Sequence, residues 1–246
     1  LCNRPFISFD ELHEMFPGVS NMTLRRDIEY FEEQSEAIKV RGGARSMKFI
    51  TTCMEGKFSL RMNENTPAKQ KIASVALSLI ETERSVFLDS GTTIFQLAAT
   101  MPDERLVVTT TGPNIALELI KKKLPIVNLV GGMLNRDSIS VSGNNATKFL
   151  ADINIDVAFI VPSGASAETG FTCGNYAECE FKRQVIEKAR RTVILADHSK
   201  FGRTLPYTFA EFGMVDTIIT DRAVSGDIAD AAKRAGTQII AADIGE

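Results

Sequence analysis

The chain has 246 residues, which is enough for one large domain or two modest ones, and we expect two unequal domains. Hydrophobic residues make up 44% and charged residues 24%, a composition that excludes a collagenous or disordered chain. No apolar run approaches the roughly 18 residues of a membrane span, and the first residues lack the pattern of a signal peptide. We therefore expect a cytoplasmic protein with no membrane partner.

The cysteine and charge patterns narrow the class further. The four cysteines form no C-x-x-C pair and there are two histidines, so the sequence predicts no zinc site, no disulfide framework and no cofactor. The net charge of −3 argues weakly against nucleic-acid binding, but the distribution of charge matters more than the total. Residues 37–48 carry no acidic residue and four basic ones: Lys39, Arg41, Arg45 and Lys48.

The first fifty residues predict two helices followed by a hairpin. Apolar residues at 9, 12, 15 and 16 are spaced like one face of a short helix. The stretch PGVSN interrupts that helix, and Ser20 is a good N-cap for a second helix at about 21–34. The segment AIKVRGGAR then alternates like a strand before two glycines, which predicts a basic hairpin, or wing.

Two adjacent arginines, Arg25 and Arg26, lie near the N-terminal end of the second predicted helix, together with Thr23. A recognition helix presents this end to the major groove of DNA, where arginine binds guanine edges or phosphates. The alternative is that both arginines are surface charges paired with Glu29 and Glu33 at helical spacing.

From residue 66 onward, short apolar strands alternate with amphipathic helices, which predicts a layered α/β domain with a largely parallel sheet. The strands that we expect lie near 85–88, 106–110, 126–130, 157–161, 192–196, 217–220 and 238–241. We therefore assign residues 1–48 to a partial winged helix-turn-helix, 49–65 to a linker and 66–246 to the α/β domain.

Ligands of such sheets bind beyond the C-terminal ends of the strands, so the loops there are the candidate site. The loop DSGTT at 89–93 opens a helix with backbone N–H groups, hydroxyls and a glycine, an arrangement suited to phosphate. It lacks the lysine and spacing of a nucleotide P-loop, and simple helix capping by Ser and Thr is the alternative. Lys200, in the later loop DHSKFG, would supply a cation for the phosphate.

Glu178 and Lys182 are four residues apart and so share one face of a helix. Such a pair is usually solvated, but this one follows a glycine-bearing loop at a helix start, where Glu178 would point into the cleft. The carboxylates of Asp89, Glu178 and Asp197 would then accept hydrogen bonds from sugar hydroxyls.

The stretch VSNMTLRRDIEYFEEQSEAIKVRGGA resembles the winged helix-turn-helix of the DeoR family of bacterial regulators, whose motif runs V-S-x-x-T-[IL]-R-R-D-[IL] and ends in a glycine-bearing wing. Such a domain normally begins with another helix, of which LCNRPF would leave at most the last residues. We expect that helix to be missing here, which exposes apolar surface on the next two helices and leaves DNA binding by this chain open. The resemblance implies DNA contacts by Ser20, Thr23, Arg25, Arg26 and Arg41.

The resemblance extends over almost the whole chain through the family motifs D-x-G-T-T, G-G, S-G-x, E-x-x-x-K, D-x-S-K-[FY]-G and T-D. It implies a Rossmann-like fold akin to ribose-phosphate isomerase and hexosamine-phosphate deaminase, with a phosphorylated sugar as effector. This chain departs from the family at Thr111–Pro113 and at Val161 and Pro162, so the sugar stays open. The effector-binding residues that we expect are Asp89, Ser90, Gly91, Thr92, Thr93, Thr111, Gly132, Ser163, Gly164, Glu178, Lys182, Asp197 and Lys200.

The resemblance therefore implies a sugar-phosphate-responsive repressor of carbohydrate-metabolism genes that binds double-stranded operator DNA as a homo-oligomer, a dimer or tetramer. One alternative is a sugar-phosphate isomerase or deaminase with Glu178 or Asp89 as general base and Lys182 or Lys200 as electrostatic partner. Another is a sensor without a DNA role. We expect no catalysis, because an enzyme has no evident use for an arginine-fronted helix and a basic wing.

Overall fold

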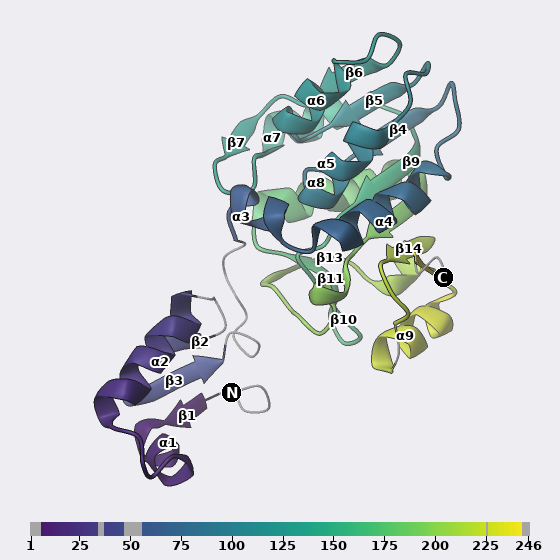
Figure 1. Cartoon of the computed structure of the whole chain (residues 1–246). Helices are drawn as coiled ribbons and strands as arrows, with labels where there is room; N and C mark the ends of the chain where they lie inside the picture. The colour runs from purple at the N-terminus through teal and green to yellow at the C-terminus, as the bar shows by residue number, and fades with distance from the viewer. Residues whose placement is uncertain (1–5, 34–36, 47–55, 225, 243–246) are drawn as a thin grey trace. The chain divides into compact units, whose positions relative to one another are not determined.

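The computed structural model describes residues 6–33, 37–46, 56–224 and 226–242, and the chain divides into two compact units, Leu1–Thr52 and Cys53–Glu246 (Figure 1). Within the described part, no helix combines the length and the apolar character needed to cross a membrane.

The first unit is a small winged helix-turn-helix, as the sequence predicts. Its helices are α1 (Phe9–Met15) and α2 (Asn21–Glu33), and an antiparallel sheet of order β1-β3-β2 is formed by β1 (Phe6–Ser8), β3 (Gly43–Ser46) and β2 (Ala37–Val40). Strand β1 was not predicted, because three residues are too few to show an alternating pattern. Lys48, which belongs to the predicted basic stretch, lies outside the described residues.

The wing depends on its two glycines. Gly42 has a φ of +88°, a conformation that side chains rarely adopt, and Gly43 lies so close to β1 that a Cβ there would be 2.1 Å from the carbonyl oxygen of Ile7. The wing therefore packs directly on β1, over a core of Ile7, Ile28 and Ala44. Of the apolar positions predicted on α2, Leu24 and Ile28 are buried, whereas Met22 is 82% exposed.

The second unit is built on a seven-stranded parallel sheet of order β15-β14-β12-β9-β4-β5-β6. All seven predicted strands are confirmed, although β12 begins three residues before its predicted start. Their bounds are β4 Ser85–Leu88, β5 Val107–Thr110, β6 Ile126–Leu129, β9 Ile155–Ile160, β12 Ala189–Leu195, β14 Thr217–Thr220 and β15 Gln238–Ala241.

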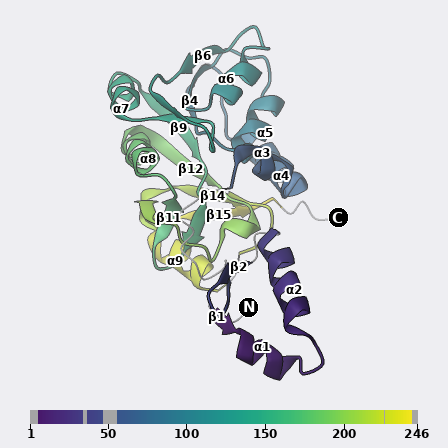
Figure 2. The ribbon, with the colours of Figure 1, turned by 90° about the vertical axis from the view of Figure 1, so that its left-hand side faces the viewer.

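Helices cover both faces of this sheet, so its central strands are apolar on both sides. In β9, Val157 and Phe159 pack into one hydrophobic cluster, while Ala158 and Ile160 pack into another on the opposite face. Figure 2 shows α7 and α8 on one side of the sheet and α5 and α6 on the other. The helix bounds are α4 Thr66–Leu77, α5 Thr92–Thr100, α6 Pro113–Leu119, α7 Asn144–Leu150, α8 Tyr176–Lys188 and α9 Asp227–Ala235.

Short antiparallel strands lie at the carboxyl ends of the parallel strands, and the sequence pattern did not predict them. One sheet has the order β10-β11-β13, with β10 Gly164–Ser166, β11 Gly170–Cys173 and β13 Tyr207–Ala210. A hairpin joins β7 (Met133–Asn135) to β8 (Ser140–Ser142). Each strand has only three or four residues, so no period of two can be recognised in it.

Part of the range expected to be a linker belongs to the second unit. Helix α3 (Phe58–Asn63) buries Phe58, whose N–H donates to the carbonyl of Asp137 at 2.7 Å. The buried ammonium of Lys69 binds the carbonyls of Arg61 and Glu64 at the other end of α3. A contact with the distant Asp137 and the buried ammonium of Lys69 hold this short helix, and the local sequence pattern does not reveal either of them.

The close approach of the wing to β1 yields a stability prediction. We expect Gly43→Ala to loosen the first unit by about 1–3 kcal/mol, because the new methyl overlaps the Ile7 carbonyl. Hydrogen exchange of the amides in β1 and β3 measures this opening. Gly18→Ala is the matched control, since a Cβ at Gly18 meets nothing within 4 Å. Equal protection in both variants would contradict the predicted overlap.

Candidate functional site

The order of the parallel sheet reverses between β4 and β9. After β4 the chain adds β5 and β6 on one side, and then β9, β12, β14 and β15 on the other. Ligands of open α/β sheets bind at such a switch point, outside the carboxyl ends of the strands. The loop after β4 and the loop after β9 are joined at this point, because the N–H of Val161, just after β9, donates to Oδ2 of Asp89, just after β4, at 3.0 Å.

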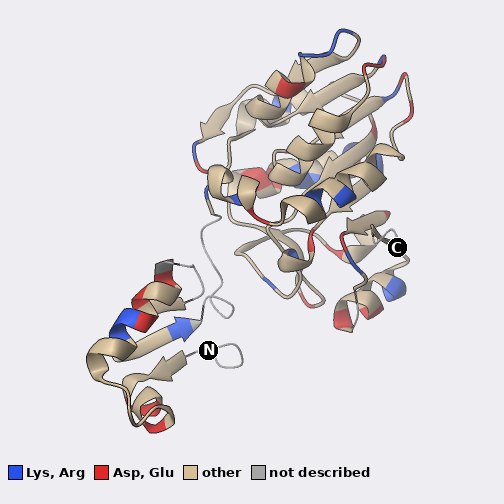
Figure 3. Cartoon of the chain, in the orientation of Figure 1, with Lys and Arg blue, Asp and Glu red and all other residues tan. Residues whose placement is uncertain are grey.

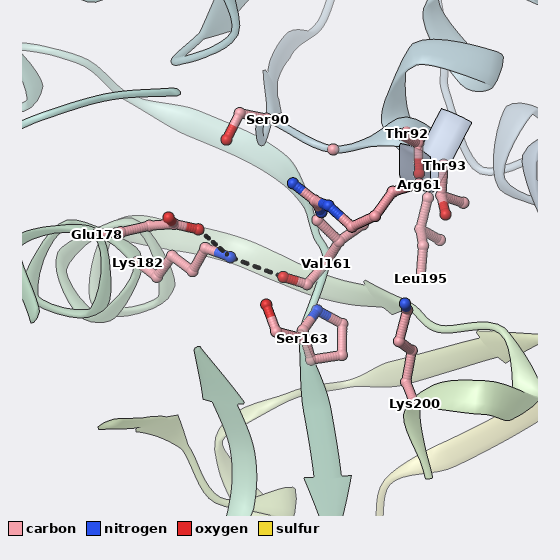
Figure 4. Close-up of a pocket in the computed structure, with 12 residues that line it drawn as sticks. Arg61, Ser90, Thr92, Thr93, Val161, Ser163, Glu178, Lys182, Leu195 and Lys200 are labelled. Atoms are coloured by element: carbon pink, nitrogen blue, oxygen red, sulfur yellow. Dashed lines mark hydrogen bonds and ion pairs between the residues drawn. The ribbon is translucent and has the colours of Figure 1, made fainter. Parts of the chain in front are cut away.

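A buried ion-pair cluster connects these loops to α8. The ammonium Nζ of Lys182 lies 3.0 Å from Asp89 Oδ2 and 2.9 Å from Glu178 Oε1, and it donates to the Val161 carbonyl at 2.7 Å (Figure 4). Asp89, Glu178 and Lys182 are 2%, 7% and 1% exposed. The alternative of a solvated surface pair is therefore wrong for Glu178 and Lys182.

Burial and the charge of Lys182 act in opposite directions on the pKa of Asp89 in this cluster. Burial raises the pKa of the Asp89 carboxyl, and the nearby carboxylate of Glu178 raises it further. The positive charge of Lys182 and the N–H groups of Val161 and Ser90 lower it, but the net direction is upward. Asp89 thus ionises less readily than an ordinary aspartate, and Lys182 provides the main opposition to its protonation.

A cavity of ≈ 20 Å³ opens beside this cluster, at the start of α5. The N-cap of α5 is Gly91, so no serine or threonine side chain occupies the capping position. Among the residues that the structure describes, the buried hydroxyl of Ser90 has no hydrogen-bond partner. A Cβ on Gly91 would lie 2.6 Å from Val161 Cγ2, so a glycine is needed for this close approach of the two loops. The cavity is lined by Arg61, Ser90, Gly91, Thr92, Thr93, Val161, Pro162, Ser163, Glu178, Lys182, Leu195 and Lys200.

Three cationic side chains from three separate elements meet at this cavity: Arg61 from α3, Lys182 from α8 and Lys200 from the short 3-10 helix η2 (His198–Lys200). In Figure 4 the guanidinium of Arg61 and the ammonium of Lys182 point into the same space. Glu178 is the acidic residue of the lining. The excess of positive charge favours an anionic ligand.

Arg61 is the main residue that sequence reasoning missed. Its backbone lies in the range expected to be a linker, and its Nε donates to the carbonyl of Gly56 at 2.8 Å. An isolated arginine in a polar stretch carries no signal of a binding role. The clue that could have identified Arg61 is Lys69, whose buried ammonium binds the carbonyl of Arg61. The sequence does not reveal that this lysine is buried.

Asp197, expected to bind effector, organises the loop that carries Lys200. Its Oδ1 accepts from the N–H of Ser199 at 2.9 Å and from Asn65 Nδ2 at 3.2 Å, while Oδ2 lies 4.0 Å from Lys200 Nζ. Asp197 does not line the cavity. Asp89 is likewise outside the lining and acts on it through Lys182.

The same loop is held from its other side by Asp221, which follows β14. Asp221 Oδ1 accepts from the N–H of His198 at 2.7 Å, and Oδ2 lies 2.8 Å from His198 Nδ1. Burial tends to raise the pKa of Asp221, but the hydrogen bonds and charge of His198 outweigh it, so the pKa is lowered. The carboxylate therefore stays ionised and anchors η2.

Three further residues expected at the site do not line the cavity and have backbone roles. The carbonyl of Thr111 accepts from the N–H of Val141 at 2.8 Å. A Cβ on Gly132 would lie 2.6 Å from the carbonyl oxygen of Ser142, and one on Gly164 would lie 2.5 Å from that of Arg203. Thr111, Gly132 and Gly164 thus allow close packing behind the site.

In the first unit, the predicted DNA contacts lie on α2 and the wing. Ser20 accepts from the N–H of Thr23 at 3.2 Å, and the two hydroxyls lie 3.0 Å apart, so both take part in capping α2. Arg25, Arg26 and Arg41 are exposed. Figure 3 marks the basic residues of α2 and of β3.

Lys39 and, to a smaller extent, Arg25 lower the pKa of the Glu29 carboxyl, so the alternative of a surface charge beside Glu29 stands for Arg25. Glu29 forms an ion pair with Lys39 of β2, and the guanidinium of Arg25 lies 5.4 Å from the centroid of the Phe9 ring. A pairing with Glu33 lies outside the described side chains. Arg26 thus remains exposed on the face that a recognition helix would present.

The buried cluster predicts a large effect of losing its cation. We expect Lys182→Met to lower the free energy of unfolding by about 3–5 kcal/mol, because two buried carboxylates lose their partner. Urea denaturation followed by circular dichroism measures the change. The control Lys121→Met removes a lysine that is 68% exposed and paired with Glu118, and should cost less than about 1 kcal/mol. A loss as small in Lys182→Met would show that the cluster contributes little.

Comparison with known protein families gives two matches. The model of the DeoR C terminal sensor domain matches residues 64–222, and the model of the DeoR-like helix-turn-helix domain matches residues 1–49.

Among solved structures, the chain is similar to ribose 5-phosphate isomerase A from Methanocaldococcus jannaschii, with a TM-score of 0.42 and 16% identity, over 56% of this chain and 55% of that chain. It is also similar to the translation initiation factor eIF-2B of Pyrococcus horikoshii OT3, with a TM-score of 0.41 and 18% identity, over 57% and 50% of the two chains.

Relatives in sequence span most of both chains. The HTH-type transcriptional repressor GlcR of Bacillus subtilis (strain 168) is 33% identical over 90% of this chain and 85% of its own. The HTH-type transcriptional regulator IolR of the same organism is 32% identical over 90% and 87%. The glycerol-3-phosphate regulon repressor of Escherichia coli (strain K12) is 29% identical over 88% and 84%. With a helix-turn-helix unit and a sensor domain that both match, the chain belongs to the DeoR family of transcription regulators.

Proposed function

We propose that this regulator represses carbohydrate-metabolism genes by binding operator DNA through its first unit, and that a phosphorylated sugar bound in the cavity of the second unit releases it. The observation that carries this proposal is the convergence of Arg61, Lys182 and Lys200 at a helix start that also holds the unpartnered hydroxyl of Ser90.

The cavity offers separate partners for the two parts of a sugar phosphate. Backbone N–H groups at the start of α5, the Ser90 hydroxyl and the cations Lys200 and Arg61 suit the phosphate. The carboxylate of Glu178 suits a sugar hydroxyl, which needs an acceptor. The relative named glycerol-3-phosphate regulon repressor supports a phosphate ester as the class of effector.

The volume of the cavity implies that effector binding moves side chains. A space of ≈ 20 Å³ holds about one water molecule, so a sugar phosphate must displace part of the lining. Helix α3 is anchored at both ends by Phe58 and Lys69, which leaves the long side chain of Arg61 as the part that moves.

Arg61 would also transmit the signal. Its Nε–H bonds the carbonyl of Gly56, which precedes α3 on the side of the chain that leads to the first unit. An effector phosphate that draws the guanidinium toward itself competes with this bond and releases Gly56. The effector then favours the state in which Gly56 is free, and it can shift DNA binding only by its differential affinity for that state.

The geometry favours binding over turnover. Asp89 does not line the cavity, and both Asp89 and Glu178 are tied to Lys182, so neither is a free general base. Incubation with a panel of sugar phosphates should give no isomerised or deaminated product, and turnover of any of them would favour the isomerase-like alternative.

For the effector, we expect Lys200→Met to lower the affinity for a phosphorylated sugar at least tenfold, because a charge-assisted hydrogen bond is lost. The weak affinity for the same sugar without its phosphate should be unchanged. Thermal shift across a panel of sugars and their phosphates, followed by titration calorimetry on any hit, measures this. Lys148→Met removes an exposed lysine of α7 outside the cavity and serves as control. Equal losses for both forms of the sugar would contradict the phosphate site.

For DNA, we expect Arg26→Ala to weaken binding by about 1–3 kcal/mol, the range for an arginine that reads a base edge. Fluorescence anisotropy on the duplex that the wild type selects from a random pool gives the affinity. Arg190→Ala, which removes an 80% exposed arginine of the second unit, controls for net charge. If the wild type selects no duplex, the sensor without a DNA role becomes the better reading.

A further inference from the structure

One edge of the parallel sheet in the described part of the chain is the strand β6, which is hydrogen-bonded to β5 on one side. Its four residues, Ile-Val-Asn-Leu, include no charge and no proline, although Pro125 and three lysines stand just before them, and Ile126 and Leu129 are 63% and 45% exposed. Proteins normally protect an edge strand with charges, proline, a bulge or a covering element, because its free backbone groups pair readily with another strand.

Exposed apolar side chains continue from β6 onto the elements that flank it in the chain. They lie on and just after α6, on β6 and on β7, within the short range 117–134, and Figures 1 and 2 both show α6 next to β6. We call this set the β6 face. Its members, 45–72% exposed, are Leu117, Ile120, Leu124, Ile126, Leu129, Met133 and Leu134.

The opposite edge of the sheet lacks this character. In β15 the exposed positions are Gln238 and Ala241, whereas Ile239 and Ile240 are partly buried against the two hydrophobic clusters. Unprotected apolar surface is therefore a property of the β6 edge and not of both edges of this sheet.

The size of the β6 face matches a stable protein interface. At roughly 100 Å² of exposed apolar area for each of its seven side chains, it amounts to about 700 Å², close to the ≈ 800 Å² per partner of a standard interface.

We propose that the β6 face binds a second copy of this chain, with the two β6 strands pairing antiparallel across a two-fold axis. A two-fold interface is formed by the same patch on both subunits, and an uncharged edge strand flanked by apolar side chains is complementary to itself. The inference gives a surface to the pairing of two DNA-binding units that the proposed function needs.

Charge selects the antiparallel arrangement. The turn before β6 carries three consecutive lysines at 121–123. Parallel pairing would place the two lysine turns side by side, whereas antiparallel pairing about the middle of β6 separates them by about nine residues of extended chain, roughly 30 Å. Each lysine turn then faces the Gly131–Gly132 end of the partner strand, which is uncharged.

The test compares the mass in solution of three proteins by sedimentation at micromolar concentration. We expect the wild type to sediment as a dimer or a multiple of it, and Ile126→Lys to halve that mass. Met214→Lys is the matched control, because Met214 is 45% exposed but lies on η3 (Phe212–Met214), outside the β6 face. A monomeric wild type, or an unchanged mass in Ile126→Lys, would overturn the proposal.

The strand direction has its own test. In a Cys2→Ser, Cys53→Ser background, the double variant Val127→Cys, Asn128→Cys should crosslink two chains on mild oxidation, because residue 127 of one β6 strand would lie opposite residue 128 of the other, whereas Lys123→Cys should not. The reverse result would exclude antiparallel pairing. A thermal-shift measurement on Ile126→Lys with sugar phosphates separates the proposed interface from the proposed effector site. A shift that is retained in this variant shows that the effector site is intact, whether or not the chain still dimerises.

Discussion

The structure of the second unit depends on Lys182, whose ammonium is bound by two carboxylates and a carbonyl at the point where the order of the sheet reverses. The ammonium is 1% exposed and joins β4, through Asp89, to β9, through the Val161 carbonyl, and to α8, through Glu178. A buried charge is tolerated where its partners are in place, so each member of the cluster fixes the position of the others. The cluster therefore forms one wall of the cavity and makes that wall rigid.

The parts of this protein that the sequence revealed are those whose signals are local. The seven parallel strands are apolar runs such as IDVAFI, and the helix-turn-helix is marked by Ser20 and by the break at Pro17–Gly18. Loops at strand ends could be located because strand polarity determines where they lie. Eight of the expected effector residues line the cavity: Ser90, Gly91, Thr92, Thr93, Ser163, Glu178, Lys182 and Lys200.

The remainder depends on contacts between distant residues. Arg61 reaches the cavity because Lys69 and Asp137 hold a six-residue helix in place, and the sequence reveals neither the burial of Lys69 nor the contact with Asp137. Asp197 carries the charge expected of a ligand, yet its Oδ1 is used within its own loop and by Asn65, and its Oδ2 is buried 4.0 Å from Lys200 Nζ. Composition identifies which groups can bind a ligand, but packing decides which of them are still available to do so.

The excess of cations around the cavity has a consequence for the effector itself. A phosphate ester carries one negative charge below its second pKa of about 6 and two above it. Arg61, Lys182 and Lys200 would bind the doubly charged form more strongly than the singly charged form. The Glu178 carboxylate repels the phosphate, so more than one of these cations is needed to offset it. If the effector is the sugar phosphate that we propose, its affinity for this cavity should therefore fall as the pH falls through that second pKa.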